Sequence, residues 1–330
     1  MEKTQKEARV KGAGVTKVIG VTAMGGSSNE VLQRIINYET RGISAAWLTV
    51  GSASLDGVTL MAAAGVVTKN ILLGTSIVPS WGRHPVVAAQ QTQVASQLSN
   101  NRFRFGVGPS HIASMKKVFG ADYRTPLTAL REYLTIVKTL LDTGAVQFKG
   151  KVYDADVALP APVPGVPVLA SALRSKSYEL CGELADGAIS WVSPASYLRD
   201  VALPAIAKGA EKARREAPPL IAHVPICVEE NTEEVRTAVR NQLAHYPHSP
   251  FYQAMFAQAG FPEAGETSTW SDEMIEAVVV SGNEEEVEER IEKLFGWGIA
   301  EIIFSVVTAG VDANSSRERS LELLSKIAQD

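Results

Sequence analysis

Cysteine is scarce in this chain, with two residues in 330. Two thiols are too few for a disulfide scaffold, and Cys181 and Cys227 form no C-x-x-C pair. Cys181 falls in an amphipathic helical segment and Cys227 in an apolar strand segment. We therefore expect both to be buried small hydrophobic residues rather than nucleophiles.

Long apolar runs are also missing. The longest, at residues 57–67, is far shorter than the roughly 20 residues that a helix needs to cross a bilayer, so we expect no membrane association. The N-terminal segment is charged and lacks the apolar core of a signal peptide, and we interpret residues 1–16 as a flexible leader. The expected location is therefore the cytoplasm.

The chain has no excess of positive charge. Lys and Arg total 32 while Asp and Glu total 36, which gives a formal net charge of −4 at pH 7. Such a surface repels phosphate backbones, and no basic stripe interleaved with aromatic residues occurs, so nucleic acid is not an expected partner. The motifs H-E-x-x-H, G-x-S-x-G and the P-loop are absent, and no metal site is predicted.

What the sequence does contain is a repeated alternation of short β-branched runs and helix-period segments. Hydrophobic residues make up 45% of the chain, which is enough for a large core. The alternation is the pattern of β/α units around a parallel sheet. Eight strands are predicted, at residues 17–23, 45–50, 71–79, 102–108, 166–171, 188–192, 220–228 and 301–307.

Eight strands that are each followed by a helix predict an α/β fold, a (β/α)8 TIM barrel with insertions at its C-terminal face. The alternative is a doubly wound open sheet with a cap. The alternation continues to the C-terminus without a break in composition, so we expect residues 17–330 to form one barrel domain. The insertions follow the fourth strand, where residues 146–156 read as a hairpin turning at Lys149 and Gly150, and the seventh helix.

Local signals predict how three helices begin. Asn29 is the expected N-cap of the first helix, and Pro85 is expected in the first turn of the helix after the third strand. Ser281 and Glu284 have the spacing of a capping box.

In a (β/α)8 barrel the active site lies at the C-terminal ends of the strands, and this rule selects the polar residues to consider. His84 and His111 both follow predicted strands, whereas His223 lies inside the seventh strand and is interpreted as a core residue. His245 and His248 form an H-x-x-H pattern without carboxylate or Cys support, which is a weak metal signal.

The segment ASALRSKS at residues 170–177 opens the fifth helix. It is rich in small and hydroxyl residues and contains Arg174. The exposed amides and the dipole of such a helix start can bind an anion, although an ordinary helix cap has the same composition.

Two longer segments carry a resemblance to a known family. Residues 71–111, ILLGTSIVPSWGRHPVVAAQQTQVASQLSNNRFRFGVGPSH, and residues 166–194, VPVLASALRSKSYELCGELADGAISWVSP, resemble the luciferase-like monooxygenase superfamily. Within it they are most similar to the branch of oxidoreductases that depend on the deazaflavin coenzyme F420. The resemblance extends from about Val18 to the final helix.

The resemblance implies a set of site residues. It implies a non-prolyl cis peptide at Ser76–Ile77 that supports the flavin-like ring, and a phosphate site at the start of the fifth helix. The implied cofactor-binding residues are Ser76, Ile77, Gly108, Pro109, Ser110, Ser171, Ala172, Leu173 and Arg174. The expected substrate pocket contains Thr22, Val50, Trp81 and Trp191.

The sequence also departs from the family pattern. Members that oxidise sugar phosphates or alcohols carry an Asp or His after the second strand, where this chain has Val50, Gly51 and Ser52. His111 stands where some relatives carry a catalytic Glu, and a histidine there could act as an acid because its reference pKa is near 6.5. His111 is therefore the candidate catalytic residue.

The resemblance implies an enzyme that transfers a hydride between F420 and a small organic substrate. One alternative is an FMN-dependent monooxygenase of the same fold, which would receive reduced flavin from a partner reductase. Another is a non-catalytic flavin-binding paralogue, in keeping with the missing acid/base after the second strand. Family members often form homodimers through barrel helices, and the apolar helix at residues 58–67 could contribute to such a contact.

Overall fold

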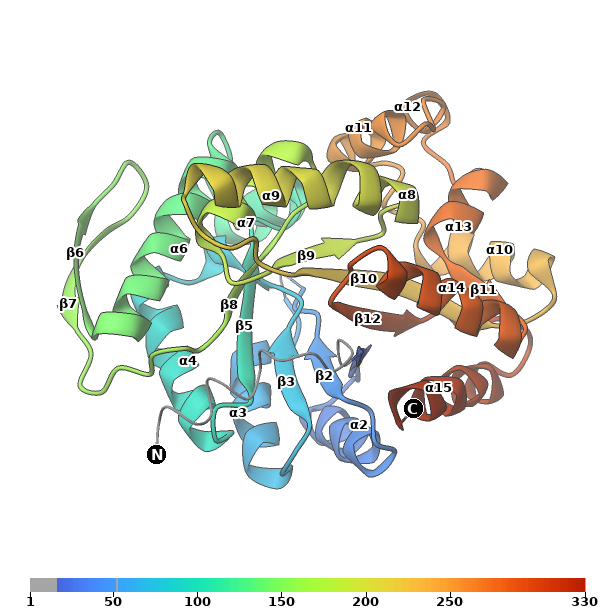
Figure 1. Ribbon diagram of the computed structural model, residues 1–330, viewed down its shortest axis with the longest axis horizontal. Coiled ribbons are helices and arrows are strands. Elements are labelled where there is room, and N and C mark those ends of the chain that lie inside the picture. The colour runs from blue at the N-terminus through green and yellow to red at the C-terminus, as the bar shows by residue number, and fades with distance from the viewer. Residues whose placement is uncertain (1–16, 52, 330) are drawn as a thin grey trace.

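The computed structural model describes residues 17–51 and 53–329, and the predicted leader lies outside these residues. Its centre is a ten-stranded sheet in which eight parallel strands close into a ring (Figure 1). The ring runs β1–β2–β3–β5–β8–β9–β10–β12 and returns to β1, where Val18 pairs with Glu301. The predicted (β/α)8 barrel is thereby confirmed.

The barrel strands lie close to the predicted segments and are almost entirely buried, as expected for parallel strands covered on both faces. Their bounds are β1 (Val18–Thr22), β2 (Ala45–Leu48), β3 (Leu72–Thr75), β5 (Phe103–Gly108), β8 (Val168–Ser171), β9 (Ala188–Trp191), β10 (Leu220–Val228) and β12 (Glu301–Val306). Two short strands, β4 (Val78–Pro79) and β11 (Val280–Gly282), extend the pairing of β5 and β10 near their C-terminal ends.

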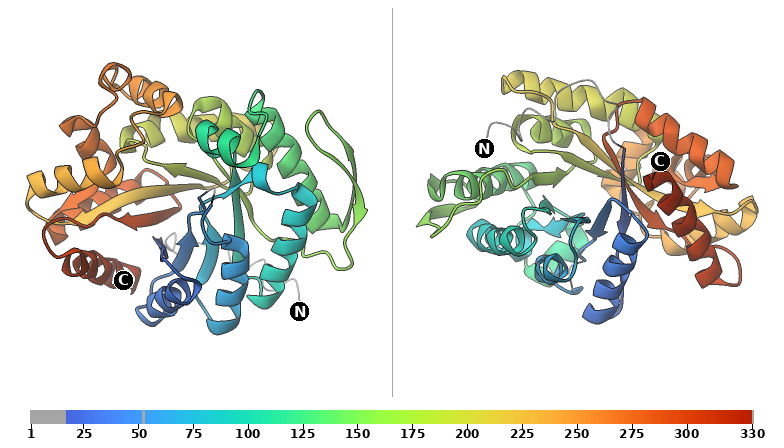
Figure 2. Two further views of the ribbon diagram at one scale, coloured as in Figure 1. Left: turned by 180° about the vertical axis from the view of Figure 1, so that it is seen from behind. Right: turned by 60° about the horizontal axis from the view of Figure 1, so that its bottom comes forward.

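Helices surround the ring, as both views in Figure 2 show. The long ones are α2 (Ser28–Thr40), α3 (Gly57–Val67), α4 (Pro85–Leu98), α6 (Pro126–Thr143), α7 (Ser175–Leu184), α9 (Leu203–Lys212), α10 (Thr232–Gln242), α14 (Glu284–Gly296) and α15 (Ala313–Gln329). The segment before α9 consists of the short α8 (Ala195–Tyr197) and a π-helical turn, η2 (Leu198–Ala202). The helical segment is therefore wider and less tightly wound at this turn than an α-helix.

The insertions contain more regular structure than the sequence indicated. After β5 come α5 (Ile112–Phe119) and, beyond α6, the hairpin of β6 (Ala145–Lys149) and β7 (Asp154–Ala158). After α10, in the insertion expected after the seventh helix, come α11 (Pro250–Gln258), α12 (Ala264–Thr267) and α13 (Asp272–Val278). These helices are short, so their periodicity is weak in the sequence.

The β6–β7 hairpin is confirmed, but its connection is wider than the predicted turn at Lys149 and Gly150, because Lys149 pairs with Asp154. Residues 151–153 donate their backbone amides to the carboxylate of Glu132 on α6, at 2.8 to 3.0 Å. The hairpin therefore lies beside α6 at the edge of the molecule (Figures 1 and 2) and does not reach the mouth of the barrel.

Two of the three predicted helix starts are wrong. Ser27, rather than Asn29, caps α2 by accepting the amide of Glu30. Asn283 caps α14 and forms a capping box with Glu286, two residues after the predicted pair. Pro85 does occupy the first turn of α4, as predicted.

One large side chain dominates the interior of the barrel. The Trp47 indole lies across the ring between Gly20 and Gly74, which leave room for it. A Cβ atom on Gly74 would lie 2.4 Å from the indole, and one on Gly20 would lie 2.7 Å from it. Further apolar side chains complete this inner core: Ala45 on the same strand, and Leu169, Ile189, Ile221 and Ile303 on other strands.

The indole is held by a buried ion pair. Trp47 Nε1 donates to Glu301 Oε1 at 2.8 Å, and Arg104 donates to both carboxylate oxygens of Glu301. The Arg104 guanidinium also lies 4.3 Å from the centre of the indole, a cation–π contact. The Glu301 side chain is 6% exposed and that of Arg104 is 12% exposed, so the two charges depend on each other for compensation.

Replacing Glu301 with Ala leaves the buried Arg104 without its partner. We expect Glu301→Ala to lower the free energy of unfolding by about 3–5 kcal/mol, because an uncompensated charge then lies inside the barrel. Urea unfolding followed by circular dichroism measures this. The matched control is Glu292→Ala, which removes an exposed ion pair with Lys17 and should cost less than about 1 kcal/mol. Equal effects of the two substitutions would contradict the assigned role of the buried pair.

Candidate active site

A cavity of about 1220 Å³ opens at the C-terminal ends of the barrel strands. It is larger than the roughly 300–1,000 Å³ that pockets for small ligands usually offer, so a cofactor and a substrate can share it. Strand ends form its inner part, and the start of α7 forms a second wall. Gln242 at the end of α10 and residues 243–258, in the insertion that follows α10, complete it.

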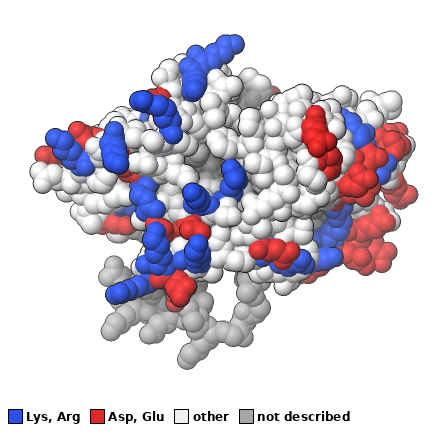
Figure 3. All heavy atoms as spheres, turned by 90° about the horizontal axis from the view of Figure 1, so that it is seen from above, with Lys and Arg blue, Asp and Glu red and all other residues white. Residues whose placement is uncertain are grey.

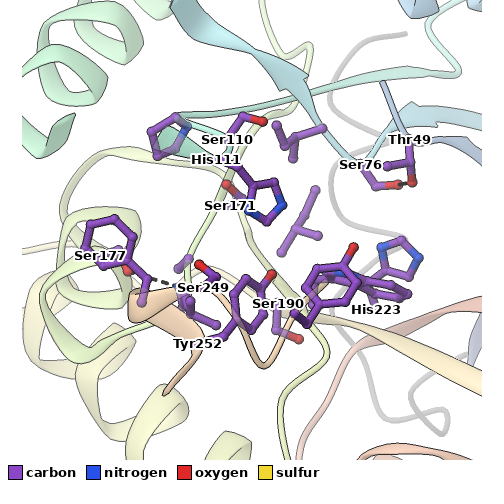
Figure 4. A pocket seen from close by; sticks show the side chains of 18 of the residues that line it. Thr49, Ser76, Ser110, His111, Ser171, Ser177, Ser190, His223, Ser249 and Tyr252 are labelled. Carbon is purple, nitrogen blue, oxygen red and sulfur yellow. Dashed lines mark hydrogen bonds between the residues drawn. The ribbon is translucent and has the colours of Figure 1, made fainter. Parts of the chain in front are cut away.

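Most of the predicted site residues line this cavity. They are Val50, Ser76, Ile77, Pro109, Ser110, His111, Ser171, Ala172, Leu173, Arg174 and Trp191. Figure 4 shows Ser76 and Thr49 at one end and Ser177 at the other, with His111 and Ser171 between them. The rule that barrel active sites lie at the C-terminal strand ends therefore brings together residues that are far apart in the sequence.

Three predicted residues do not line the cavity. Thr22 lies behind Ser305, whose Oγ is 3.2 Å from Thr22 Oγ1. Trp81 lies in the 3-10 turn η1 (Ser80–Gly82), and its ring packs 5.4 Å from the ring of Tyr123, which takes its place in the wall. The predictions for Thr22 and Trp81 as pocket residues are therefore wrong.

Gly108 is the third predicted residue that does not line the cavity, and its role is steric. A Cβ atom there would lie 1.9 Å from Ser171 Oγ, so only glycine lets the ends of β5 and β8 approach this closely. The turn that follows is fixed by Ser110, which has a φ of +55°, and by a 2.6 Å hydrogen bond from the Tyr123 hydroxyl to the Ser110 carbonyl.

The bulge after β3 has the form that the resemblance implies. The Ser76–Ile77 peptide bond is cis, and both residues line the cavity. Ser76 Oγ lies 3.3 Å from Thr49 Oγ1, which ties the bulge to the end of β2. The amide of Ser76 donates to the Leu48 carbonyl at 2.9 Å, so the bulge is attached to the sheet on that side.

The start of α7 offers anion-binding amides, although not those that the resemblance indicated. The Ala172 amide already donates to the Ile189 carbonyl, and the amides of Leu173 and Arg174 both donate to Ser177 Oγ. The amides of Ser175 and Lys176, in the first helical turn, have no acceptor among the described residues. The donors for an anion therefore lie about two residues further along the chain.

The charged side chains of the cavity wall are all positive. Among the described residues that line it, Arg174 and Lys176 are the charged side chains, and none is Asp or Glu. Acidic side chains instead gather at the edge of the molecule that carries α10, α13 and α14, on the right in Figure 3, whereas Lys and Arg spread over the left and centre. The cavity is therefore suited to an anionic ligand.

His111 lies under the insertion that follows α10. Its ring is 6.0 Å from that of His245 and stacks at 6.0 Å on Tyr252, measured between ring centres. Burial lowers the pKa of His111 below its usual 6.5, and the nearby His245 lowers it further. The imidazole is therefore mainly neutral at pH 7 and gains its proton in acidic solution.

The sequence predicted the position of His223 only in part. It is 3% exposed, as expected for a core residue, yet its ring borders the cavity next to Trp191, with ring centres 4.1 Å apart. Its Nε2 lies 2.8 Å from Ser305 Oγ. Burial lowers the pKa of His223 to about 3, so the ring stays neutral at physiological pH.

Several wall residues had no signal strong enough to predict them. His245, Tyr246, Tyr252 and Gln258 all come from the insertion after α10, and Ser305 comes from the last strand. The sequence HYPHSPFY at residues 245–252 does concentrate aromatic and imidazole groups in a stretch expected to cover the barrel mouth. Its H-x-x-H spacing is a weak metal-binding pattern and does not indicate a cavity wall.

The other reactive groups lie elsewhere. Cys181 and Cys227 are buried outside the cavity wall, and burial raises their pKa values to about 12 and about 11. His84 caps α4, with Nδ1 accepting the Val86 amide at 3.3 Å. Among residues 17–51 and 53–329, no cluster of three His, Cys, Asp or Glu side chains could hold a metal, and no helix could span a membrane.

The buried His223 makes stability depend on pH. Its pKa is about 3 in the folded chain and near 6.5 when unfolded, so the unfolded state binds more protons between these values. We expect stability to fall as the pH drops below 6.5, with this residue contributing up to about 1.4 kcal/mol per pH unit. Urea titrations at pH 7, 6 and 5 should show a shallower decline in His223→Gln. A decline as steep as that of the wild type would contradict the buried, neutral state.

Comparison with known proteins gives a consistent answer. The family model for luciferase-like monooxygenases matches residues 13–301. The chain is 24% identical to a 5,10-methylenetetrahydromethanopterin reductase of Archaeoglobus fulgidus, over 87% of this chain and 91% of that protein. It is 26% identical to an F420-dependent glucose-6-phosphate dehydrogenase of Nakamurella multipartita, over 78% of each.

Among solved structures, an F420-dependent secondary alcohol dehydrogenase in complex with an F420–acetone adduct superposes with a TM-score of 0.77. The alignment covers 94% of this chain and 97% of that one at 18% identity, so it concerns the fold. The family match extends over most of the barrel, from residue 13 to Glu301, the first residue of β12. The chain belongs to the luciferase-like monooxygenase family.

Proposed function

We propose that this protein is an oxidoreductase that transfers a hydride between coenzyme F420 and a small organic substrate. The observation that carries the proposal is the cavity wall, which combines Arg174, Lys176 and two unpaired amides with no Asp or Glu among the described residues. Two anionic cofactors, F420 and FMN, would suit it. The named relatives that depend on F420 favour the deazaflavin.

The start of α7 is the proposed phosphate site. The amides of Ser175 and Lys176 and the positive end of the helix dipole favour an anion there, and the Arg174 and Lys176 side chains add two positive charges. Ser171, Ala172 and Leu173 would line this end of the cofactor, with the Ala172 and Leu173 amides remaining in the protein's own hydrogen bonds.

The ring would lie in the inner cavity, between the Ser76–Ile77 bulge and the turn of Pro109 and Ser110. Ile77, Val50 and Trp191 provide apolar surfaces there and exclude water. A bound deazaflavin supplies the hydride, so the protein has to orient both partners, keep the site dry and manage a proton.

His111 is the residue we propose to manage that proton. It borders the cavity at the start of α5, and its side chain makes no cap hydrogen bond to that helix. Substrate reduction consumes a proton together with the hydride, and a protonated His111 could donate it. The lowered pKa means that the protonated fraction grows as the pH falls below 6.5.

The alternatives predict different ligands. An FMN-dependent monooxygenase of this family would use the same anion site and would need reduced flavin from a partner reductase. A non-catalytic paralogue would bind the cofactor without turnover, in keeping with the absence of a titratable side chain at Val50 and Gly51. The specific observation that favours an enzyme is His111 at the cavity wall.

Two further proposals concern assembly and location. Val66, Val67, Val94 and Leu98 on α3 and α4 are between 48% and 63% exposed, and a homodimer contact would cover such a surface. For location we propose the cytoplasm, in keeping with the absence of a membrane-spanning helix among the described residues.

The cofactor proposal is tested by titration of the purified protein with F420 and, separately, with FMN, followed by fluorescence quenching. We expect F420 to bind more tightly, and the double substitution Arg174→Ala/Lys176→Ala to weaken F420 binding at least about tenfold because two charge-assisted contacts are lost. Lys208→Ala, at an exposed pair with Glu179, is the control. Tight binding of FMN alone would favour the monooxygenase, and binding of neither would overturn both enzyme proposals.

The proposed role of His111 makes a second prediction. With F420 bound and small ketones, aldehydes and enones as substrates, His111→Ala should lower kcat about 100-fold while leaving the dissociation constant of F420 nearly unchanged. The wild-type rate of reduction should rise from pH 7.5 to 5.5 as His111 becomes protonated, and the variant should lose this rise. Equal pH profiles would show that another group supplies the proton.

A further inference from the structure

The inner end of the cavity is apolar and uncharged. Val50, Ile77, Ile189, Trp191 and Val306 form most of its wall. The charged pair Arg174 and Lys176 lies at the other end, at the start of α7. Polar groups reach the inner end from the Thr49–Ser76 pair and from His223 with Ser305. Ser190, next to Trp191, also lines the cavity, and its Oγ is buried without a hydrogen-bond partner among the described residues.

The Thr49 and Ser76 hydroxyls face each other, whereas one atom of His223 is left over. Its Nε2 contacts Ser305 Oγ at 2.8 Å, and Ser305 Oγ contacts Thr22 Oγ1 at 3.2 Å. Thr22 Oγ1 is in turn 3.4 Å from the Phe304 carbonyl oxygen. His223 Nδ1 has no hydrogen-bond partner among the described residues, although the side chain is almost fully buried.

His223, Ser305 and Thr22 thus form a hydrogen-bond chain that ends at the Phe304 carbonyl. Counting its donors and acceptors gives the arrangement of its hydrogens in the absence of a ligand. If Thr22 donates to the Phe304 carbonyl, Ser305 can donate to Thr22, and His223 Nε2–H can donate to Ser305. Every hydrogen then has an acceptor, and Nδ1 presents a lone pair. If the two hydroxyls rotate, Thr22 donates to Ser305 and Ser305 donates to Nε2, and the histidine presents an Nδ1–H.

At His223 Nδ1, this hydrogen-bond chain can thus offer a ligand either an acceptor or a donor. It cannot supply a net proton. It ends at the Phe304 carbonyl, which has no proton to give. Trp191 restricts the ring further, with its centre 4.1 Å from that of the imidazole. His223 is therefore equipped to hold a polar group in a fixed place, and proton supply is left to a group outside this chain such as His111.

We propose that His223 is the substrate-binding residue of the inner cavity, that Ser305 and Thr22 are its positioning residues, and that the substrate is an uncharged, mainly apolar molecule with one hydroxyl or carbonyl oxygen held at Nδ1. The inference rests on the proposed function, because hydride transfer interconverts these two oxygen groups. A hydroxyl donates to the Nδ1 lone pair, and a carbonyl accepts from Nδ1–H. A charged substrate would find no opposite charge at this end of the cavity.

The positions of the hydrogens in the His223–Ser305–Thr22 chain are tested by NMR of protein labelled with ¹⁵N-histidine, without cofactor. In the wild type we expect the neutral Nε2–H tautomer of His223 at pH 7 and at pH 5. Ser305→Ala removes the acceptor of Nε2–H, and Thr22→Val leaves Ser305 free to donate to Nε2, so both should raise the Nδ1–H population. The control is Ser320→Ala, a buried serine that accepts the Val228 amide on the far side of the strand from the cavity wall residues.

Identical His223 signals in the wild type, Ser305→Ala and Thr22→Val would overturn the positioning role. The same measurement then tests the ligand, with F420 bound. Cyclohexanone should move His223 towards Nδ1–H, and cyclohexanol should leave it as Nε2–H. If neither compound changes the His223 signals up to its solubility limit, the substrate-binding role is overturned.

Kinetics separate this inference from the proposed function. For reduction of cyclohexanone by reduced F420, His223→Leu should raise KM at least about tenfold, because one hydrogen bond in a dry site is lost, with the dissociation constant of F420 unchanged. His223→Asn keeps a polar atom bonded to Cγ, as Nδ1 is, and should recover part of the loss. Failure of F420 to bind defeats the proposed function. Binding with equal KM values for wild type and His223→Leu, or turnover of carboxylates only, defeats this inference alone.

Discussion

The barrel depends on how its interior is filled. Trp47 reaches across the ring because Gly20 and Gly74 have no side chains, and the Arg104–Glu301 pair holds the indole in place. A ring of eight strands has room for side chains and for little else at that level. Since the interior is closed there by protein, open space remains at the C-terminal strand ends, and the cavity lies at that end.

The eight strands could be predicted because each is a short apolar run bounded by turn residues, and strands buried on both faces read that way. The helix starts could not be predicted equally well. Ser27 and Asn29 are both good capping residues, and which one caps α2 depends on where the chain leaves β1. The short helices α11 to α13 lack a long periodic face, so their sequence resembles that of a loop.

The site could be predicted in part, because predicting the strands also gives their C-terminal ends, where the active site of a barrel lies. The resemblance implied cofactor binding by the stretch from Ser171 to Arg174, which lines the cavity, yet hydrogen bonding within the protein decides which amides remain available. That depends on Ser177, one turn away. His223 was assigned to the core for sound reasons and is buried, but a buried residue at the end of a barrel can also face the cavity.

The contact between Gly108 and Ser171 has a consequence for how this enzyme family could diversify. The ends of β5 and β8 touch there, and neither can move apart without breaking the pairing of Val107 with Ala170. The width of the barrel mouth is therefore constant on that side. Residues 243–258 lie outside the ring of strands, so changes at their cavity-lining positions leave the strand pairing intact, whereas Met255 and Phe256 are buried in the core and are constrained. New substrate preferences should arise first in that segment.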